Sequence, residues 1–430
     1  MLSALPMHAA MPSNSTDYDM QDDHSDTYSV LSSSSRFAPS IASSATSCDW
    51  EMRSASPAPS VYSVTSSLRA ASYRHEFGRG INNYSDVYRL PADDEEFERL
   101  DLQHLMFMEV MGKYPPPLPD ILRDDIPGEQ KTCVDLGCGS GSWSVPVFPS
   151  SPLPPVLIPS RILDVARDFP HCSAVAVDLV PMQSINMPPN CRSEVDDINL
   201  GLQHFYGDFN VVHARLISSG VSPAFSAPTA ARADLADRRA ISVSDPLPPP
   251  LWPCVPSSQI RDYEGLIDQM AQALRPGGLL DLTEFDFRVY DLNKKVILDP
   301  KVSAFARWMN LLHDAVQYSG GEPDAANHLE TWVSRHSSYE HAVYREFWFA
   351  SSPWRAGHDA ETRWQNRIAN VFRDDVLAFL KSGRTLLLGT GLPEKVVDEV
   401  EEKARTELME ARVPSYVRVE NVYARKKHQP

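Results

Sequence analysis

The 430-residue sequence predicts an α/β fold, in which a mainly parallel β-sheet is covered by helices on both faces. Short apolar runs that indicate buried strands alternate with segments of helical periodicity, an order typical of such sheets. The first of these runs, residues 132–136, leads directly into a glycine-rich stretch at residues 137–141. Ligands of open α/β sheets bind at the carboxyl ends of the strands, so we expect a ligand site beside this glycine-rich loop.

The N-terminal part of the chain differs in composition from the rest. Residues 1–82 are rich in Ser, Pro, Asp and Ala, and their apolar residues are isolated and without period. Such a segment cannot bury enough apolar surface to offset the entropy of ordering, so we expect it to be disordered. Order is expected to begin near Asn83, and residues 83–430 are expected to form one folded domain.

Composition excludes some classes of function. The formal net charge of -17 argues against a surface that coats nucleic acid, which would be basic. The six cysteines are scattered without a Cys-x-x-Cys pair, and the sequence therefore predicts neither a metal site nor a disulfide framework. No secretory signal and no long apolar run is evident, so we expect no membrane association and a cytoplasmic or nuclear location.

The first predicted helix opens with acids at 93–96 and ends near Gly112, before a run of three prolines. Further helices are expected at 162–169, 261–274, 300–318, 323–334, 360–382 and 393–411. Strands are expected at 132–136, 174–178, 191–195, 209–214, 279–285, around 343–349 and at 415–423. A tight turn is expected at Arg275-Pro-Gly-Gly278.

The glycine-rich stretch reads Gly137-Cys138-Gly139-Ser140-Gly141, followed by Ser142. It is therefore not the Gly-x-Gly-x-x-Gly that cradles a dinucleotide pyrophosphate. In nucleotide-binding α/β folds an acid roughly 20 residues beyond the loop bonds the ribose hydroxyls. Asp178 ends the second strand and meets that spacing only if the proline-rich stretch 144–161 is looped out.

Several motifs, which follow one another along roughly residues 83 to 425, resemble those of the fungal LaeA-like family of class I S-adenosylmethionine (SAM)-dependent methyltransferases. They are Tyr88-Arg-Leu-Pro-Ala-Asp-Asp-Glu95, Glu98-Arg-Leu-Asp-Leu-Gln-His104, Val134-Asp-Leu-Gly-Cys-Gly-Ser-Gly-Ser-Trp143, Val177-Asp-Leu-Val-Pro-Met-Gln183, Pro189-Asn-Cys191 with Val195-Asp-Asp197, Phe209-Asn-Val-Val-His-Ala-Arg215 and Leu274-Arg-Pro-Gly-Gly278. The resemblance implies a Rossmann-like sheet of seven strands, with an antiparallel last strand near 415–425. It also implies S-adenosyl-L-methionine as the cofactor.

The resemblance also implies roles for individual residues. The loop Gly137, Cys138, Gly139, Ser140 and Gly141 would lie under the cofactor, with Asp135 nearby. Asp178 would hold the ribose hydroxyls, and Asp196 or Asp197 would approach the adenine amino group. Tyr88 and His104, with Gln103, would belong to an N-terminal cover.

Each of the weaker assignments has a structural alternative. The pair Asp196-Asp197 could be a solvated strand end, and Tyr88 and His104 could be ordinary packing residues. His213, at the end of the fourth strand, is a candidate general base, although a lone histidine there is more often structural. Glu284 and Asp286 are weaker candidates for that role.

Two proline-rich stretches, 144–161 and 221–259, interrupt otherwise continuous motifs. Excising them restores Gly-Ser-Trp-Ile-Leu-Asp-Val and Ile-Ser-Ser-Gly-Ile-Arg-Asp-Tyr. Our hypothesis is that both are retained introns in a conceptual translation.

Three functions compete at this point. The sequence favours a SAM-dependent methyltransferase that acts on a small-molecule or protein acceptor. The alternative is a SAM-binding regulatory protein of a nuclear complex, with dispensable catalysis, that controls secondary metabolism. A nucleotide-dependent oxidoreductase is disfavoured, because the third pyrophosphate glycine and a Tyr-x-x-x-Lys pair are lacking.

Overall fold

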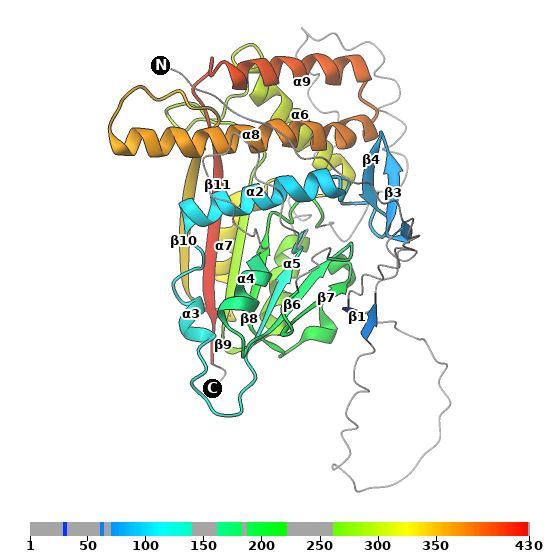
Figure 1. Ribbon diagram of the computed structural model, residues 1–430, viewed down its shortest axis with the longest axis vertical. Coiled ribbons are helices and arrows are strands. Elements are labelled where there is room, and N and C mark those ends of the chain that lie inside the picture. Colours follow the sequence, from blue (N-terminus) through cyan, green and yellow to red (C-terminus); the bar gives the residue numbers. More distant parts are fainter. Residues whose placement is uncertain are drawn as a thin grey trace, which may run out of the picture.

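A central β-sheet organises the computed structural model, which describes residues 29–31, 61–63, 70–139, 161–182, 187–221 and 261–428 (Figure 1). Its seven main strands are β5 (Thr132–Leu136), β6 (Ser173–Asp178), β7 (Cys191–Val195), β8 (Phe209–Arg215), β9 (Leu274–Phe285), β10 (Tyr339–Ala350) and β11 (Tyr416–Lys426). They lie in the order β10-β11-β9-β8-β5-β6-β7. From β7 to β9 all neighbours are parallel, whereas β11 is antiparallel to both β9 and β10. The predicted fold class, including the antiparallel last strand, is confirmed.

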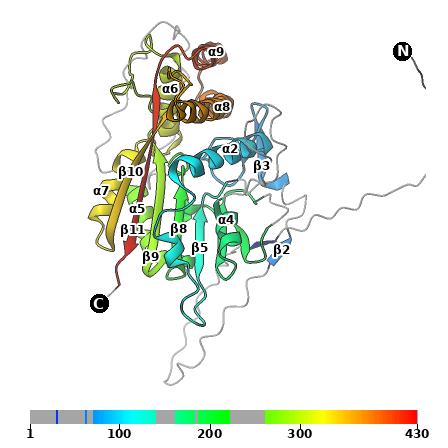
Figure 2. The same cartoon turned by 60° about the vertical axis from the view of Figure 1, so that its left-hand side comes forward.

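The sheet is covered on both faces because its strands are apolar on both faces. Along β5, Cys133 packs with α3 (Leu118–Ile121) and α4 (Arg161–Asp168), whereas Val134 and Leu136 pack on the other side. That opposite face is covered by α5 (Arg261–Ala273) and α7 (Leu329–Arg335) (Figure 2). Successive side chains of a strand point to opposite faces, so the apolar run fills two cores.

A third core lies beyond one end of the sheet. It is built by α2 (Asp94–Met111), α6 (Ala304–Ser319), α8 (Ala360–Gly389) and α9 (Glu394–Met409), and Figure 1 shows this helical layer above the strands. Helix α2 begins where the Asp93 carboxylate accepts a hydrogen bond from the Glu96 amide at 3.1 Å. Because α2 contacts the loop after β5, this layer lies over the carboxyl ends of the parallel strands.

A hairpin of β3 (Tyr73–Glu76) and β4 (Arg79–Asn82) precedes α2. Its turn residues Phe77 and Gly78 have φ values of 50° and 80°. A type I′ turn requires a positive φ at both of its central residues. Arg79 binds the Asp93 carboxylate at 2.7 Å and so ties the hairpin to the start of α2. Two further short strands, β1 (Ser29–Leu31) and β2 (Val61–Ser63), extend the sheet next to β7. Regular structure is therefore described within 1–82, before the expected start near Asn83.

The predicted turn at 275–278 is wrong in detail, because these residues belong to β9. Phe209 pairs with Leu274 and Val211 with Leu279, so the extra residues form an irregularity within the ladder. Gly277, with φ of 75°, allows it. The two proline-rich stretches and the intron hypothesis concern residues outside the described ranges, except at their edges.

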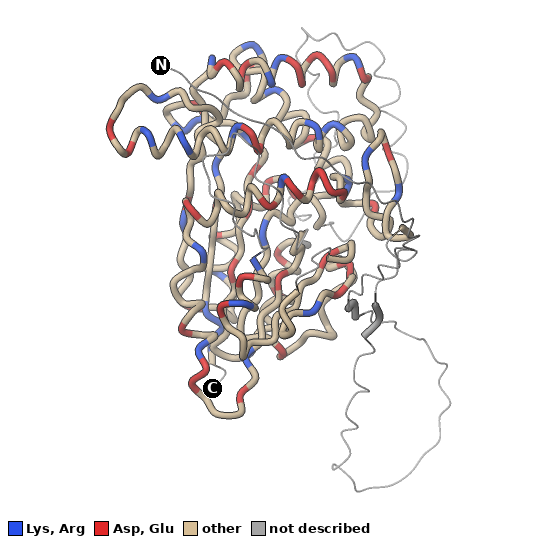
Figure 3. Tube along the Cα trace, viewed as in Figure 1, with Lys and Arg blue, Asp and Glu red and all other residues tan. Residues whose placement is uncertain are grey.

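Acidic and basic residues are interspersed along the outer helices (Figure 3). Arg384 of α8, for example, lies between Glu394 and Asp398 of α9, at 3.0 and 2.5 Å. Within the described residues no helix has the length and apolar character needed to cross a membrane.

Candidate functional site

One cavity brings the predicted site residues together at the carboxyl ends of β5, β6, β7 and β8. Of the twelve candidates, ten line it: Tyr88, His104, Asp135, Gly137, Cys138, Gly139, Asp178, Asp196, Asp197 and His213. The other two, Ser140 and Gly141, lie outside the described residues. Helix α2 closes the cavity on one side with Phe97, Leu100 and Asp101.

The described part of the glycine-rich loop turns through left-handed backbone conformations. Gly137 and Gly139 have φ values of 70° and 69°, a region that residues with a Cβ rarely adopt. A Cβ on Gly137 would lie 2.5 Å from the Ile217 side chain, and one on Gly139 would lie 3.3 Å from Leu100. The loop is therefore held close to both neighbours, and its backbone faces the cavity.

Asp178 connects the end of β6 to the glycine loop. One carboxylate oxygen accepts a hydrogen bond from the Gly139 amide at 2.8 Å, and the other accepts from the Val180 amide at 3.3 Å. Burial raises the pKa of Asp178 to about 6, in spite of these hydrogen bonds. Each oxygen keeps a further lone pair, so the ionised carboxylate can accept hydrogen bonds from a ligand in the cavity.

The acidic pair after β7 is partly engaged within the protein. Asp197 accepts hydrogen bonds from the backbone amide and side chain of Asn199, at 3.0 and 2.7 Å. The Asp196 carboxylate lies 3.3 Å from the His204 ring, and burial raises the pKa of Asp196. Both nevertheless line the cavity, so the structure leaves either one within reach of a ligand.

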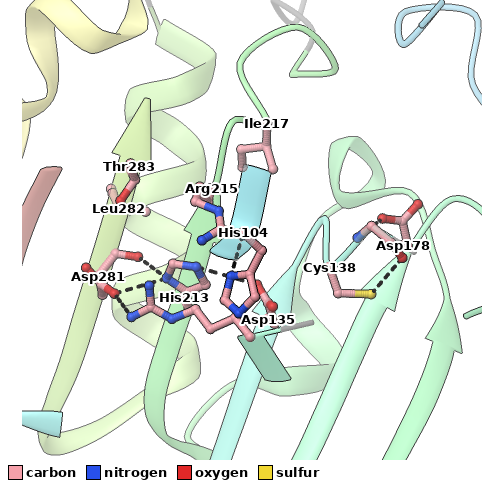
Figure 4. A network of polar contacts seen from close by, with 12 residues as sticks. His104, Asp135, Cys138, Asp178, His213, Arg215, Ile217, Asp281, Leu282 and Thr283 are labelled. Atoms are coloured by element: carbon pink, nitrogen blue, oxygen red, sulfur yellow. Dashed lines mark hydrogen bonds and ion pairs between the residues drawn. The ribbon is translucent and has the colours of Figure 1, made fainter. Parts of the chain in front are cut away.

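His213 lines the cavity and belongs to a buried network of polar contacts (Figure 4). Its Nδ1 lies 3.1 Å from the Asp281 carboxylate and 3.1 Å from the Asp281 carbonyl oxygen, and its Nε2 lies 3.9 Å from Asp135. Since both Asp281 atoms accept hydrogen bonds, Nδ1 carries the proton. Burial lowers the pKa of His213, so the ring is neutral near pH 7.

Asp281 is the anion at the centre of this network. Arg161, the first residue of α4, forms an ion pair with it, and the Asn421 amide donates to it at 2.8 Å. Burial alone would raise the pKa of Asp281, but Arg161, His213 and Asn421 hold it well below its usual range. The network therefore joins α4, β8, β9 and β11.

His104 reaches the same region from α2. Its Nδ1 lies 3.2 Å from the Arg215 guanidinium, and its Nε2 lies 3.4 Å from Asp164. Burial lowers the pKa of His104 to about 4, so its ring is neutral and can accept the hydrogen bond from Arg215. This contact ties the helical cover to the end of β8.

Sequence reasoning missed three members of the site: Arg161, Arg215 and Asp281. Arg215 ends β8 and lines the cavity, so the rule that found His213 near the same strand end could also have found it. Asp281 lies in the middle of β9 and pairs with Arg161 of a distant helix. No spacing in the sequence indicates that pairing.

The two weaker base candidates lie elsewhere, since neither Glu284 nor Asp286 lines the cavity. Glu284 is fully buried and accepts hydrogen bonds from the Ile217 amide and the Tyr263 hydroxyl, both at 2.8 Å. Asp286 is bound by Tyr290 and by Arg418. Among the described residues no group of three or more His, Cys, Asp or Glu side chains could hold a metal ion.

This strand order, with a glycine-rich turn after β5 and an acid after β6 at a shared cavity, defines a class I SAM-dependent methyltransferase domain. The secondary metabolism regulator laeA of Coprinopsis cinerea is 38% identical over 360 residues, which cover 82% of this chain and 74% of that protein. The chain belongs to the LaeA-like family.

Other comparisons agree with this family. The secondary metabolism regulator laeA of Aspergillus flavus is 32% identical over 139 residues, 31% of this chain and 30% of that protein. Methyltransferase pytC of Aspergillus terreus is 25% identical over 274 residues, 63% of each chain. No family model matches the chain.

Solved structures give weaker likenesses. A phosphoethanolamine N-methyltransferase 2 of Haemonchus contortus, with S-adenosylhomocysteine, has a TM-score of 0.34 and 11% identity, covering 78% of this chain and 60% of that one. A geranyl diphosphate C-methyltransferase of Streptomyces coelicolor has a TM-score of 0.30 and 11% identity, covering 81% and 89%. Because these scores are low, the class depends on the strand order and the site.

Proposed function

We propose that this protein transfers a methyl group from S-adenosyl-L-methionine to a small-molecule or protein acceptor. The observation that carries the proposal is the convergence of ten predicted residues on one cavity at the carboxyl ends of the strands. The domain that does this would comprise 83–430 together with the hairpin at 73–82.

The residues around the cavity suit this cofactor. The loop at Gly137 and Gly139 offers a close backbone surface without a phosphate-binding third glycine, which suits the methionine part of SAM. Asp178 offers a buried carboxylate for two ribose hydroxyls, and Asp196 or Asp197 offers an acceptor for the adenine amino group. Tyr88 and His104 close the cavity from the side of the helical cover.

SAM supplies a methyl group that its sulfonium already activates, and the methyl–sulfur electron pair leaves with sulfur as S-adenosylhomocysteine. The protein's contribution is then to position the two reactants and to exclude water. An acceptor that carries a proton on the attacking atom would lose it to solvent or to a base.

His213 fits a positioning role better than the role of that base. Its Nδ1 is held by Asp281, and its side chain is 3% exposed to solvent. We infer that it fixes Asp135 and Asp281 below the cofactor. A kcat–pH profile without a histidine inflection, together with lower stability of His213→Ala, would support this role.

Calorimetric titration of SAM into the purified full chain tests the proposal. Binding is expected, and Gly139→Asp should abolish it, because the new side chain is strained at φ of 69° and enters the cavity loop. Gly391→Asp is the matched control, since its φ is 87° and no atom lies within 4 Å of its Cβ position. A folded wild-type chain that does not bind SAM would refute the function.

A regulatory role is the second candidate, and the names of the laeA relatives favour it. In this version the protein binds SAM as part of a nuclear complex that controls secondary metabolism, and catalysis is dispensable. Returning Gly139→Asp to a strain that lacks the gene tests this role: restored metabolite production would show that regulation does not need methyl transfer and would favour the regulatory protein, whereas loss would count against a role without SAM.

A further inference from the structure

A second cavity adjoins the cofactor cavity on the side of the helical layer. It lies among α2, α6, α8 and the adjacent ends of β9 and β11. Four residues line both cavities: Tyr88, Leu100, Gln103 and Leu216. A molecule in the second cavity would therefore lie directly beside the cofactor, with these four side chains around the junction.

The wall of the second cavity is aromatic and aliphatic. Six phenylalanines line it: Phe107, Phe285, Phe287, Phe305, Phe372 and Phe379. The rings of Phe285 and Phe287 lie 4.1 Å apart between centroids, so together they present an extended apolar surface. Such a surface gains most from burying a flat apolar molecule.

The charged groups of this wall are paired with one another. Arg99 is the one basic residue among the described residues that line it, and it binds Glu96 at 2.7 Å and Asp375 at 2.8 Å. Gln103 donates a further hydrogen bond to Asp375 at 3.1 Å. With two carboxylates around one guanidinium, the cavity has no unpaired cation to receive a phosphate or carboxylate group.

We propose that the second cavity is the methyl-acceptor site and that it takes a neutral, flat, mainly apolar small molecule. A polypeptide acceptor would bring backbone N–H and C=O groups into a wall whose charged side chains are already engaged with one another. An anionic acceptor would meet excess negative charge. The inference depends on the proposed function, since it names the substrate class of the same site.

The transfer needs no further reactant. A lone pair of the acceptor atom forms the new bond to the methyl carbon, the methyl–sulfur bond breaks, and its electrons remain on sulfur. Where the attacking atom is a hydroxyl oxygen, its proton passes to solvent. Burial raises the pKa of Tyr88, so its phenol stays neutral and can hydrogen-bond such a hydroxyl at the junction of the two cavities.

Calorimetric titration of three probes into the full chain, saturated with S-adenosylhomocysteine, tests the proposal. The probes are 2-naphthol, 2-naphthoate and 2-naphthyl phosphate, which share one ring system and differ in charge. We expect 2-naphthol to bind at least tenfold more tightly than either anion. Asp375→Asn should narrow the difference in affinity between 2-naphthol and the two anions, because it leaves Arg99 with one carboxylate partner. A purely structural role for Asp375 would leave that difference in affinity unchanged.

A cavity-filling variant locates the binding site. Val376→Phe adds a ring to the wall of the second cavity only and should weaken 2-naphthol binding at least tenfold, with unchanged affinity for S-adenosylhomocysteine. Val343→Phe, on an exposed position of β10, is the matched control. If Val376→Phe does not fold, the affinities of the wild-type chain for the neutral probe and the two anionic probes still test the proposal.

Two results would overturn the inference and leave the proposed function intact: S-adenosylhomocysteine binds but 2-naphthol does not, or the anions bind as tightly as 2-naphthol. If Val376→Phe folds and binds 2-naphthol normally, the location is wrong. Failure of S-adenosylhomocysteine itself to bind to the folded chain would instead refute the proposed function, and with it the acceptor site.

Discussion

Asp178 places a buried carboxylate against the glycine loop, and its protonation state sets what it can bind. The ionised form accepts hydrogen bonds from the Gly139 and Val180 amides and has lone pairs left for a ligand. Burial holds its pKa at about 6, closer to neutrality than an exposed aspartate. Cofactor affinity should therefore depend on pH in a range where most carboxylates do not titrate.

We expect Asp178→Asn to weaken binding of S-adenosylhomocysteine at pH 7.5 by about 10- to 100-fold, the effect of losing hydrogen bonds to a charged group. In the wild type, affinity should fall as the pH drops below about 6, because protonation removes the carboxylate. Calorimetry between pH 5 and 8 checks both effects. Asp120→Asn, at an exposed acid, should change neither.

Gly137 is confined both by its backbone and by a neighbour. We expect Gly137→Ala to lower the free energy of unfolding by about 1–2 kcal/mol for the left-handed backbone, with an added cost because the new methyl lies 2.5 Å from Ile217. Gly391→Ala has the same backbone strain without a neighbour and should cost less. Urea denaturation measures the difference in stability loss between Gly137→Ala and Gly391→Ala. Combining Gly137→Ala with Ile217→Ala should reduce that difference, because the Ile217 side chain is then shortened. Equal losses for Gly137→Ala and Gly391→Ala would contradict the contact with Ile217.

At the level of single residues, simple positional rules indicated part of the candidate site, and the other candidates came from the family resemblance. An acid at the end of a buried strand and glycines after the first strand are local signals. They indicated Asp135, Asp178 and the glycine-rich loop, and the structure brings these residues to one cavity. The partners of these residues were not predictable. Asp281 and Arg161 meet only because α4 packs against the sheet, and that contact depends on the whole fold.

Helix α2 is the element that joins the cofactor cavity to the helical layer. Its Arg99 lies between Glu96 of the same helix and Asp375 of α8, and all three side chains are buried. Burial raises the pKa of Asp375, so the guanidinium is needed to keep this carboxylate ionised. The ion pairs therefore hold α2 against α8 within the helical layer.

Removing this cation should be costly. We expect Arg99→Leu to lower the free energy of unfolding by about 3–5 kcal/mol, because two buried carboxylates lose their partner. The loss should be smaller at pH 5 than at pH 7.5, since Asp375, with its raised pKa, can then take up a proton. Arg384→Leu, in the partly exposed cluster of α8 and α9, should cost about 1 kcal/mol or less. Similar losses for both variants in urea denaturation would contradict this account.

Among the elements, the hairpin β3–β4 was not predicted. Its turn is Phe77-Gly78 instead of the Asn-Gly or Asp-Gly that signals a type I′ turn, and its strands carry little apolar alternation. It is held by a tertiary contact instead, the pair of Arg79 with Asp93. Strands β5, β6, β8 and β9 were predictable because they are mainly apolar runs, and β10 because its apolar residues alternate.

For the whole molecule, the open question is the status of the stretches 144–161 and 221–259. Arg161, the last residue of the first stretch, pairs with Asp281 and begins α4, so its removal has a defined cost. We expect chains without both stretches to bind S-adenosylhomocysteine. A chain in which the first deletion ends at 160 should be more stable than one in which it ends at 161.

That difference should be largest near neutral pH and should shrink in acid. The pKa of Asp281 is held low in the presence of Arg161, so the stability from this pair is present above the ordinary aspartate pKa and is lost as the pH falls through the lowered value. Thermal denaturation of the two shortened chains from neutral pH down to about pH 2 measures it. Sequencing of the transcript tests the intron hypothesis separately; messages that mainly retain both stretches would refute it.

The two cavities share four side chains, those of Tyr88, Leu100, Gln103 and Leu216. This shared lining has a consequence for how the two ligands bind. A ligand that orders these four side chains from one cavity also orders them for a ligand in the other cavity. Thermodynamic linkage then requires the effect to be mutual: if the cofactor tightens acceptor binding by some factor, the acceptor tightens cofactor binding by the same factor. The LaeA-like protein would thereby bind the two ligands as a cooperative pair.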